Sequence, residues 1–98
     1  MGDSRGGSDH GLPDFEWDEY NEEKLLERHG VSAYEAEQCF ANPHTKRRHG
    51  DDLVMLGKTD GDRMLLLVYE QKSDGVVRVY SAREMTEKER RVYRQNAR

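Results

Sequence analysis

One stretch changes its hydrophobic period halfway along: Arg78-Val-Tyr-Ser-Ala-Arg-Glu-Met-Thr-Glu-Lys-Glu-Arg-Arg-Val-Tyr93. Its first part alternates as a β-strand does, so neighbouring side chains fall on opposite faces. The alternation places Val77, Val79 and Ser81 on one face and Val76, Arg78 and Tyr80 on the other. We therefore predict a strand over residues 76–82, with Arg83 just past its end.

The second part of the same stretch predicts a helix. Thr86 and Glu89 have the spacing of a capping box, in which each side chain accepts a hydrogen bond from the backbone of the other residue. The helix that follows is basic, because it carries Lys88, Arg90, Arg91 and Arg94. A strand with polar side chains on one face thus leads through Arg83 into a basic helix, and we look for chemistry there.

Composition indicates a small domain with a highly charged surface. The chain has 98 residues, 34% hydrophobic and 37% charged, which suits one modest core. One cysteine, Cys39, excludes an internal disulfide framework and favours a reducing compartment. No apolar run approaches the roughly 20 residues of a membrane span, and the start lacks the apolar segment of a secretory signal. We expect a cytoplasmic protein.

The charges are unevenly distributed along the chain. Residues 1–42 hold 11 acidic and 3 basic side chains, whereas residues 43–98 hold 9 acidic and 13 basic ones. The second part of the chain can therefore present a basic surface to a phosphate chain, although ordinary solvated faces would give the same counts. Residues 1–13 contain nothing to bury, so we expect a flexible tail there and a single folded domain over residues 14–98.

Local signals predict two helices before the sheet. Asp18 is suited to cap a helix over about residues 19–29, which Gly30 ends as a left-handed cap. Ser32 and Glu35 form a second capping box, opening a helix that Asn42-Pro43 ends. Phe15-Glu-Trp17 alternates in polarity and predicts a short edge strand ahead of both helices.

Apolar runs separated by turns predict the sheet. We expect strands over residues 53–58, 63–70 and 76–82, joined by turns at residues 59–62 and 73–75. The polar segment from His44 to Asp52 is read as an exposed loop. The predicted class is α+β: an antiparallel sheet of three to four strands, with two N-terminal helices and a C-terminal helix on one of its faces.

Several side chains are candidates for a site on the opposite face of the sheet. Arg78 and Arg83 can grip phosphate through paired hydrogen bonds, and Tyr80 can bond to phosphate or stack on a base. The alternative is that both arginines pair with surface carboxylates. His29, at the last turn of the first helix, is suited to move a proton near neutral pH, or merely to cap the helix end. Lys24 on the same helix is more simply a solvated side chain.

The strongest local basic run is Lys46-Arg47-Arg48-His49. It is either a solvated loop or a sequence-independent contact to phosphates. His44 and His49 with Asp51 and Asp52 match no zinc pattern, and supporting cysteines are absent, so we expect no metal. Cys39 lies on the apolar stripe of the second helix and is expected in the core.

Four pieces in order resemble one family, the BrnT-like toxins of bacterial type II toxin–antitoxin systems. They are Phe15-Glu-Trp-Asp18, Arg28-His-Gly-Val31 followed by Glu35-Ala36, Met64–Tyr69, and above all Val79-Tyr-Ser-Ala-Arg-Glu-Met-Thr-Glu-Lys-Glu-Arg-Arg-Val-Tyr93. Together they cover about residues 14–94. The segment between Pro43 and Leu53 departs from the family pattern, because it looks shorter than in many members and has its own basic composition.

The resemblance implies a RelE-like fold and an endoribonuclease, a hydrolase of RNA that inhibits translation without a metal or other cofactor. It also implies an RNA substrate and a cognate antitoxin, usually encoded beside the toxin. Carried onto this chain, the implied catalytic residues are His29, Arg63 and Arg83, followed by Tyr80 and Lys24. The residues expected to contact RNA are Lys46, Arg47, Arg48 and Arg78. The competing hypothesis is a non-enzymatic module that binds a partner protein or nucleic acid.

Overall fold

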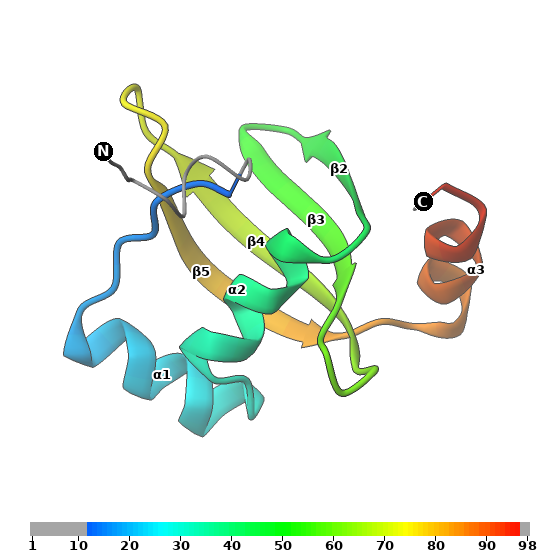
Figure 1. Ribbon diagram of the computed structural model, residues 1–98, viewed down its shortest axis with the longest axis horizontal. Helices are drawn as coiled ribbons and strands as arrows, with labels where there is room; N and C mark the ends of the chain where they lie inside the picture. Colours follow the sequence, from blue (N-terminus) through cyan, green and yellow to red (C-terminus); the bar gives the residue numbers. More distant parts are fainter. Residues whose placement is uncertain (1–11, 97–98) are drawn as a thin grey trace, which may run out of the picture.

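A four-stranded antiparallel sheet carries helices on both sides (Figure 1). The computed structural model describes residues 12–96. Its elements in chain order are α1 (Glu19–His29), α2 (Ala33–Ala41), β2 (His44–His49), β3 (Asp52–Lys58), β4 (Met64–Gln71), β5 (Val77–Glu84) and α3 (Glu87–Asn96). The predicted fold class is confirmed. The tail predicted over residues 1–13 falls almost entirely outside the described residues.

The sheet is a simple meander with the strand order β2-β3-β4-β5. Each strand pairs antiparallel with the next, as short connections allow. β4 lies inside the sheet, and its alternate residues Leu65, Leu67 and Tyr69 are buried beneath the first two helices. The apolar residues between them, Leu66 and Val68, face the other side of the sheet, which explains why this strand is apolar on both faces.

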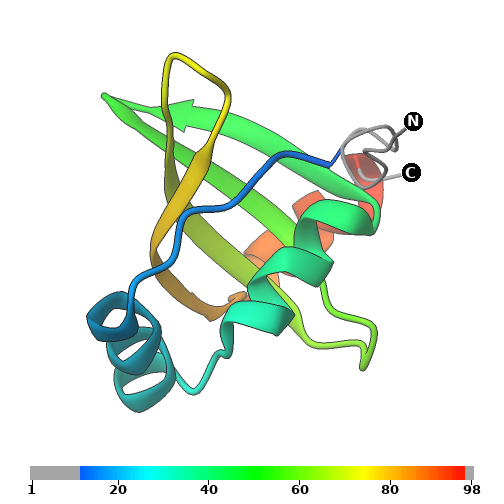
Figure 2. The ribbon, with the colours of Figure 1, turned by 60° about the vertical axis from the view of Figure 1, so that its left-hand side comes forward.

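The main core lies between the sheet and the two helices α1 and α2, which cover the same face (Figure 2). Helix α2 packs on β3 and helix α1 on β5. The fully buried members of this core include Leu25, Val31, Ala36, Cys39, Met55, Leu65, Leu67 and Val79. Burial raises the pKa of the Cys39 thiol to about 12, so this cysteine is a packing residue, as its place on the apolar stripe predicts.

The predicted helix ends are confirmed in detail. The side chain of Asp18 accepts a hydrogen bond from the Asn21 backbone N–H at 2.8 Å, and Gly30 ends α1 with φ of 66°. Ser32 and Glu35 form the complete capping box of α2. At α3, the Thr86 hydroxyl accepts from the Glu89 N–H at 3.2 Å, and the Glu89 carboxylate accepts from the Thr86 N–H at 2.9 Å. These ends were predictable because each involves neighbours in sequence.

The strand β5 departs from strict alternation. Tyr69 pairs with Val79 but Val68 pairs with Ser81, so Tyr80 is an extra residue on the bulged strand. Ser81 consequently lies on the face opposite Val77 and Val79, and the prediction that it shares their face is wrong. The strand also continues to Glu84, so Arg83 lies within it rather than past its end.

The predicted loop over His44–Asp52 is wrong for most of its length. Residues His44–His49 form β2, which pairs with β3 from His44↔Gly57 to His49↔Asp52. Gly50 and Asp51 make the two-residue turn between them, and Gly50 has φ of 65°. The segment has no apolar face that would identify it as a strand, because it is an edge strand whose last four residues are exposed.

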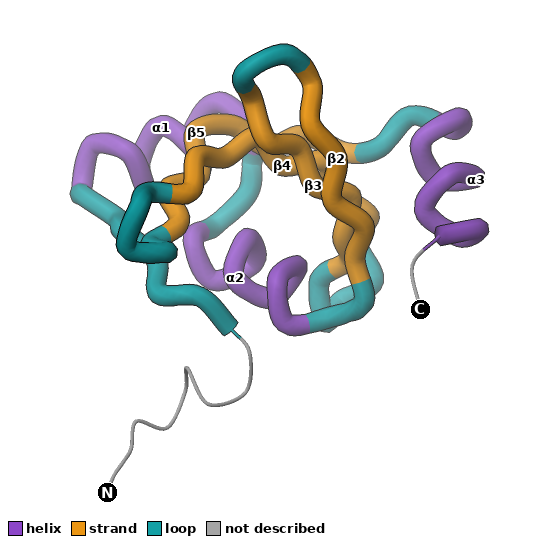
Figure 3. The backbone as a smooth tube through the Cα atoms, turned by 90° about the horizontal axis from the view of Figure 1, so that it is seen from above, coloured by secondary structure: helices purple, strands orange, loops and turns teal. Residues whose placement is uncertain are grey.

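Helix α3 corrects a further expectation, because it does not join the other helices on their face. Figure 3 shows it at the β2 end of the sheet, apart from α1 and α2. Its Tyr93 and Val92 pack with Leu56, Leu66 and Met85 in a second small cluster, and the Tyr93 hydroxyl donates to the Pro43 carbonyl oxygen at 2.8 Å. The face carrying Leu56 and Leu66 is therefore covered at one end and open at the other.

One edge of the sheet is closed by the segment before α1. The Glu16 N–H donates to the Val77 carbonyl oxygen at 2.9 Å, and the Val77 N–H donates to the Asp14 carbonyl oxygen at 2.8 Å. Phe15 and Val77 form a single parallel bridge rather than the short strand predicted over residues 15–17. In the part of the chain that the structure describes, no helix is long and apolar enough to cross a membrane.

Candidate functional site

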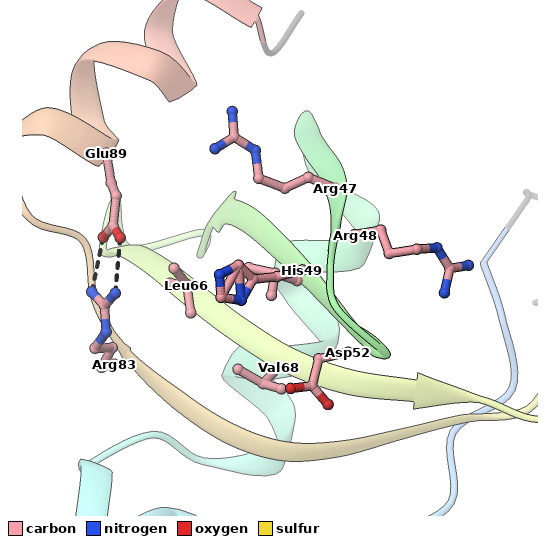
Figure 4. Close-up of a pocket in the computed structure, with 9 residues that line it drawn as sticks. Arg47, Arg48, His49, Asp52, Leu66, Val68, Arg83 and Glu89 are labelled. Atoms are coloured by element: carbon pink, nitrogen blue, oxygen red, sulfur yellow. Dashed lines mark hydrogen bonds and ion pairs between the residues drawn. The ribbon is translucent and has the colours of Figure 1, made fainter.

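A hollow of about 590 Å³ lies on the sheet face opposite α1 and α2, beside the start of α3 (Figure 4). Its floor is apolar and consists of Val54, Leu66 and Val68. Its rim is polar and consists of Arg47, Arg48, His49, Asp52, Arg83 and Glu89. An apolar floor with a few convergent polar groups is the usual form of a binding site.

Strand register explains why these side chains meet. Residues directly opposite one another in an antiparallel sheet share a face. Arg47 is opposite Val54, and Arg83 is opposite Leu66, so both arginines stand on the face that carries the apolar floor. His49 is opposite Asp52 at the turn between β2 and β3. The two ends of the hollow are thus built from edge strand β2 and from β5.

Arg83 is held by a carboxylate from α3. Its two terminal nitrogens donate to the two oxygens of Glu89 at 2.8 Å each, and Nη1 also donates to the Glu84 carbonyl oxygen at 3.1 Å. The guanidinium lowers the pKa of Glu89 to about 2, so the pair is ionised at neutral pH. Within residues 12–96, Nε of Arg83 donates no hydrogen bond. This N–H, on the side of the guanidinium, is left for another oxygen acceptor.

Glu89 therefore performs two tasks with one carboxylate. It completes the capping box of α3 through the Thr86 N–H, and it fixes the orientation of Arg83 through two charge-assisted hydrogen bonds. The start of α3 and the arginine of the hollow are thereby positioned together. Figure 4 shows the pair bridging the helix and β5 at one side of the hollow.

Arg47 and His49 have no such partners. Both are exposed, and among the described residues their side chains form no hydrogen bond or ion pair. In Figure 4, Arg47 extends on the α3 side of the hollow and His49 reaches over its floor. A cation and an imidazole are thus available on the same face as Arg83.

The residues predicted to contact RNA divide between the two faces of the sheet. Arg47 borders the hollow, but Lys46 pairs with Met55 and Arg48 with Leu53, whose side chains point toward α1 and α2. Arg48 touches the rim, yet its side chain points away from His49 (Figure 4). Arg78 is paired with Asp18 at 3.0 Å, the surface ion pair that the sequence left open as an alternative.

Arg63, a predicted catalytic residue, joins three segments of the fold instead of lining the hollow. Its Nη1 donates to both oxygens of Glu35 at 3.0 Å and to the Gly30 carbonyl oxygen at 2.9 Å. Its Nη2 donates to Glu84 at 3.3 Å. Burial tends to raise the pKa of Glu35, but hydrogen bonds from Ser32 and Arg63 together hold it below the usual range. Arg63 thus ties the α1–α2 junction to the sheet.

The other predicted catalytic residues are dispersed. His29 is exposed at the end of α1. The carbonyl oxygen of the next residue, Gly30, accepts a hydrogen bond from Arg63. The Lys24 ammonium lies 5.3 Å from the ring centre of Tyr20. Tyr80 is exposed at the bulge and borders a smaller hollow of about 330 Å³ with Arg48 and Tyr69. Of the five predicted catalytic side chains, only Arg83 lines the main hollow, and the catalytic roles of all five stay predictions.

Sequence reasoning missed His49 and Glu89 as site residues. The sequence predicts His49 only as part of a basic run that contacts phosphates or as a rejected metal ligand, because a polar segment without an apolar face does not indicate a strand. The usable signal was the pair Gly50-Asp51, a two-residue turn of the kind that joins hairpin strands. Glu89 was recognised as a cap, but nothing local shows that the same carboxylate meets Arg83.

The chain belongs to the BrnT family, because the model of that family, described as the ribonuclease toxin of type II toxin–antitoxin systems, matches residues 17–89. The match covers α1 through the capping box of α3 and includes all the residues that line the hollow. Membership implies an RNA target and an antitoxin partner. A search of curated proteins finds no match.

The contacts of Arg63 give a prediction about stability. Replacing Arg63 with alanine is expected to lower the free energy of unfolding by about 1–3 kcal/mol, because the partly buried Glu35 carboxylate loses its charged donor and the Gly30 carbonyl loses a hydrogen bond. Urea denaturation followed by circular dichroism measures this. Lys58→Ala is the control, since Lys58 forms an exposed pair with Asp62 at 3.4 Å and should cost at most about 1 kcal/mol.

An unchanged unfolding midpoint for Arg63→Ala would show that these contacts contribute nothing to the fold. If such a stable variant also lost RNA cleavage, the catalytic role predicted from the sequence would apply to Arg63 after all.

Proposed function

We propose that the chain is an endoribonuclease toxin that cleaves RNA in the bacterial cytoplasm by metal-independent phosphodiester transfer, and so inhibits translation. One observation carries the assignment of the site: Arg47, His49 and Arg83 line one hollow with an apolar floor on the open face of the sheet. The family supplies the RNA target. The reaction and its inhibition of translation are those that the resemblance to RelE-type ribonucleases implies.

The proposed reaction needs two kinds of help from the protein. The ribose 2′-oxygen attacks the adjacent phosphorus, the bond from phosphorus to the 5′-oxygen breaks, and a 2′,3′-cyclic phosphate and a 5′-hydroxyl result. Negative charge gathers on the phosphoryl oxygens, where preorganised donors are most effective. Nε of Arg83 and the guanidinium of Arg47, which have no hydrogen-bond partner among residues 12–96, are suited to supply those donors.

His49 is the group placed to move protons in this reaction. The 2′-hydroxyl must lose a proton and the departing 5′-oxygen must gain one, and an imidazole exchanges protons near neutral pH. His49 lies over the floor, where the ribose and base of the substrate would rest on Leu66 and Val68. His29, the histidine predicted from the sequence, stands at the end of a helix that covers the other face.

Substituting His49 and substituting His29 are therefore expected to have different effects on the rate of RNA cleavage. In purified protein, His49→Gln is expected to lower the rate of RNA cleavage by about 10²-fold or more, the usual contribution of a general acid or base. His29→Gln should leave the rate within a few-fold of wild type. The reverse result would move the site to the α1 end and contradict the assignment of the hollow.

The competing function is a non-enzymatic binding module, and one observation favours it. The terminal nitrogens of Arg83 are already bound to Glu89, so only part of this guanidinium remains for a phosphate. If that occupation prevents catalysis, the hollow still binds an anionic ligand through Arg47. Tight RNA binding by the wild type with no cleavage under any condition would establish this second function.

A further inference from the structure

The two edges of the sheet are treated differently. Segment Asp14–Glu16 pairs with the outer side of β5 through two backbone hydrogen bonds. The backbone of His44–His49 bonds to β3 on one side. On its other, outer side it forms no backbone hydrogen bond with any residue in the range 12–96. Helix α3 contacts this strand near its beginning, where the Tyr93 hydroxyl donates to the Pro43 carbonyl oxygen, but it forms no backbone hydrogen bond with the strand among the described residues. An edge with free N–H and C=O groups is a template for another strand.

The two-residue turn after β2 determines which residues of β2 direct their backbone N–H and C=O groups away from β3. In a hairpin with a two-residue turn, the closing pair exchanges both of its hydrogen bonds, and bonded pairs then alternate along the ladder. The closing pair here is His49↔Asp52. His49, Arg47 and Thr45 therefore bond to β3, whereas Lys46 and Arg48 point their N–H and C=O groups outward.

The hairpin between β3 and β4 independently supports the same alternation of inward and outward backbone groups in β2. The Thr59 N–H donates to the Arg63 carbonyl oxygen at 2.9 Å. Alternation along β3 and β4 then directs the backbone groups of Met55 and Gly57 toward β4. Val54 and Asp52 consequently bond to β2, which again leaves Lys46 and Arg48 facing outward.

Charge decides what kind of strand fits this edge. Lys46, Arg47 and Arg48 are all exposed. A second copy of β2 would place like charges opposite one another, which is unfavourable. Cationic side chains on an edge also discourage neutral strands from adding. A segment with carboxylates at alternate positions would instead pair with these cations.

We propose that an extended acidic segment of the antitoxin adds to the outer edge of β2 as a fifth strand along Lys46–Arg48. The inference rests on the proposed function only in taking the partner to be the antitoxin. Strand addition uses backbone hydrogen bonds for affinity and alternate side chains for specificity. Carboxylates on the hollow side of the added strand would lie beside Arg47 and His49, where they exclude the phosphate of RNA.

Backbone amide exchange tests this proposal at single residues. The probe is the cognate antitoxin, co-expressed and purified as a complex with the full chain. In the free chain, the amides of Arg47 and His49 are expected to exchange slowly and those of Lys46 and Arg48 rapidly. In the complex, Lys46 and Arg48 should slow by at least about tenfold. Unchanged exchange at both residues in a saturated complex would overturn the proposal.

A pair of variants at one position isolates the backbone donor. Lys46→Pro removes the outward N–H and the side chain, whereas Lys46→Ala removes only the side chain. The proline variant is expected to bind the antitoxin about threefold to tenfold more weakly than the alanine variant. Equal affinities would contradict strand addition. If Lys46→Pro fails to fold, the exchange measurement on the wild type decides.

Both measurements are made without RNA, so they separate this inference from the proposed function. Protected amides in a chain that does not cleave RNA would support the fifth strand while rejecting the ribonuclease. Rapid exchange at Lys46 and Arg48 in the complex of an active ribonuclease would reject the fifth strand alone.

Discussion

Replacing Arg83 with alanine is expected to lower the rate of RNA cleavage by about 10²–10³-fold, the usual cost of losing one preorganised donor to a developing negative charge. Arg83 stands opposite Leu66 at the edge of the apolar floor, and Glu89 fixes its orientation through two hydrogen bonds of 2.8 Å. The measurement is single-turnover cleavage of a short RNA by purified protein. Arg83→Lys should recover little of the rate, because an ammonium cannot reproduce the planar fork.

The control is another arginine of the same strand. Arg78 pairs with Asp18 at 3.0 Å and does not line the hollow, so Arg78→Ala should cleave within a few-fold of wild type. Circular dichroism must show that Arg83→Ala keeps its helices, since the substitution also frees Glu89. Cleavage by a folded Arg83→Ala variant within a few-fold of wild type would remove Arg83 from the site.

Gly57 is the position where a single methyl group is expected to do most damage to the fold. A Cβ atom at Gly57 would lie 2.8 Å from Met55 Sδ, 2.9 Å from Cys39 Cβ and 3.1 Å from the Cys39 carbonyl oxygen. The methionine side chain can move, but the backbone of α2 at Cys39 cannot do so without shifting the helix. We expect Gly57→Ala to lower the free energy of unfolding by about 1–3 kcal/mol, as overpacking does.

Gly61→Ala provides a matched control for that substitution. At Gly61 an added Cβ meets only Thr59 Oγ1, at 3.9 Å, so stability should stay within about 0.5 kcal/mol of wild type. Thermal unfolding reports both variants, and each kcal/mol corresponds to about 4–8 °C in Tm for a domain of this size. Equal Tm values for the two variants would mean that α2 does not approach β3 as closely as the structure shows.

Much of the fold was predictable because its signals are local. The caps at Asp18, Ser32 and Thr86 each join residues within three positions of one another, so sequence spacing alone reveals them. The apolar runs of the inner strands β3 and β4 were equally plain. Edge strand β2 was missed because none of its residues is buried in the core, and periodicity detects only a strand with one buried face.

The site was less predictable because its geometry depends on distant partners. Arg83 was predicted both from its place between a strand and a basic helix and from the family resemblance, yet its ion pair with Glu89 depends on where α3 packs. Arg63 and Glu35 are far apart in sequence and meet only when α2 packs on the sheet. The bulge at Tyr80 shifts the register of β5 by one residue, so each later residue of this strand lies on the opposite face from the one that alternation predicts.

Two capping-box glutamates, Glu35 and Glu89, each also bind an arginine, so the same kind of contact occurs both at the junction of α1 and α2 and at the hollow. Glu35 at the start of α2 receives Arg63, and Glu89 at the start of α3 receives Arg83. In each case an arginine binds a carboxylate that also caps a helix; Arg63 lies just before β4 and Arg83 lies in β5. One pair stabilises the junction of α1 and α2, and the other holds an arginine at the rim of the hollow.

The most direct test of the account is cleavage in the presence of EDTA. Purified chain would be incubated with free RNA and with messenger RNA on translating ribosomes, and the ends of the products identified. The account predicts cleavage at an unchanged rate in EDTA, leaving 2′,3′-cyclic phosphate and 5′-hydroxyl ends. Absence of cleavage on both substrates, or complete loss of free-RNA cleavage on adding EDTA, would contradict it.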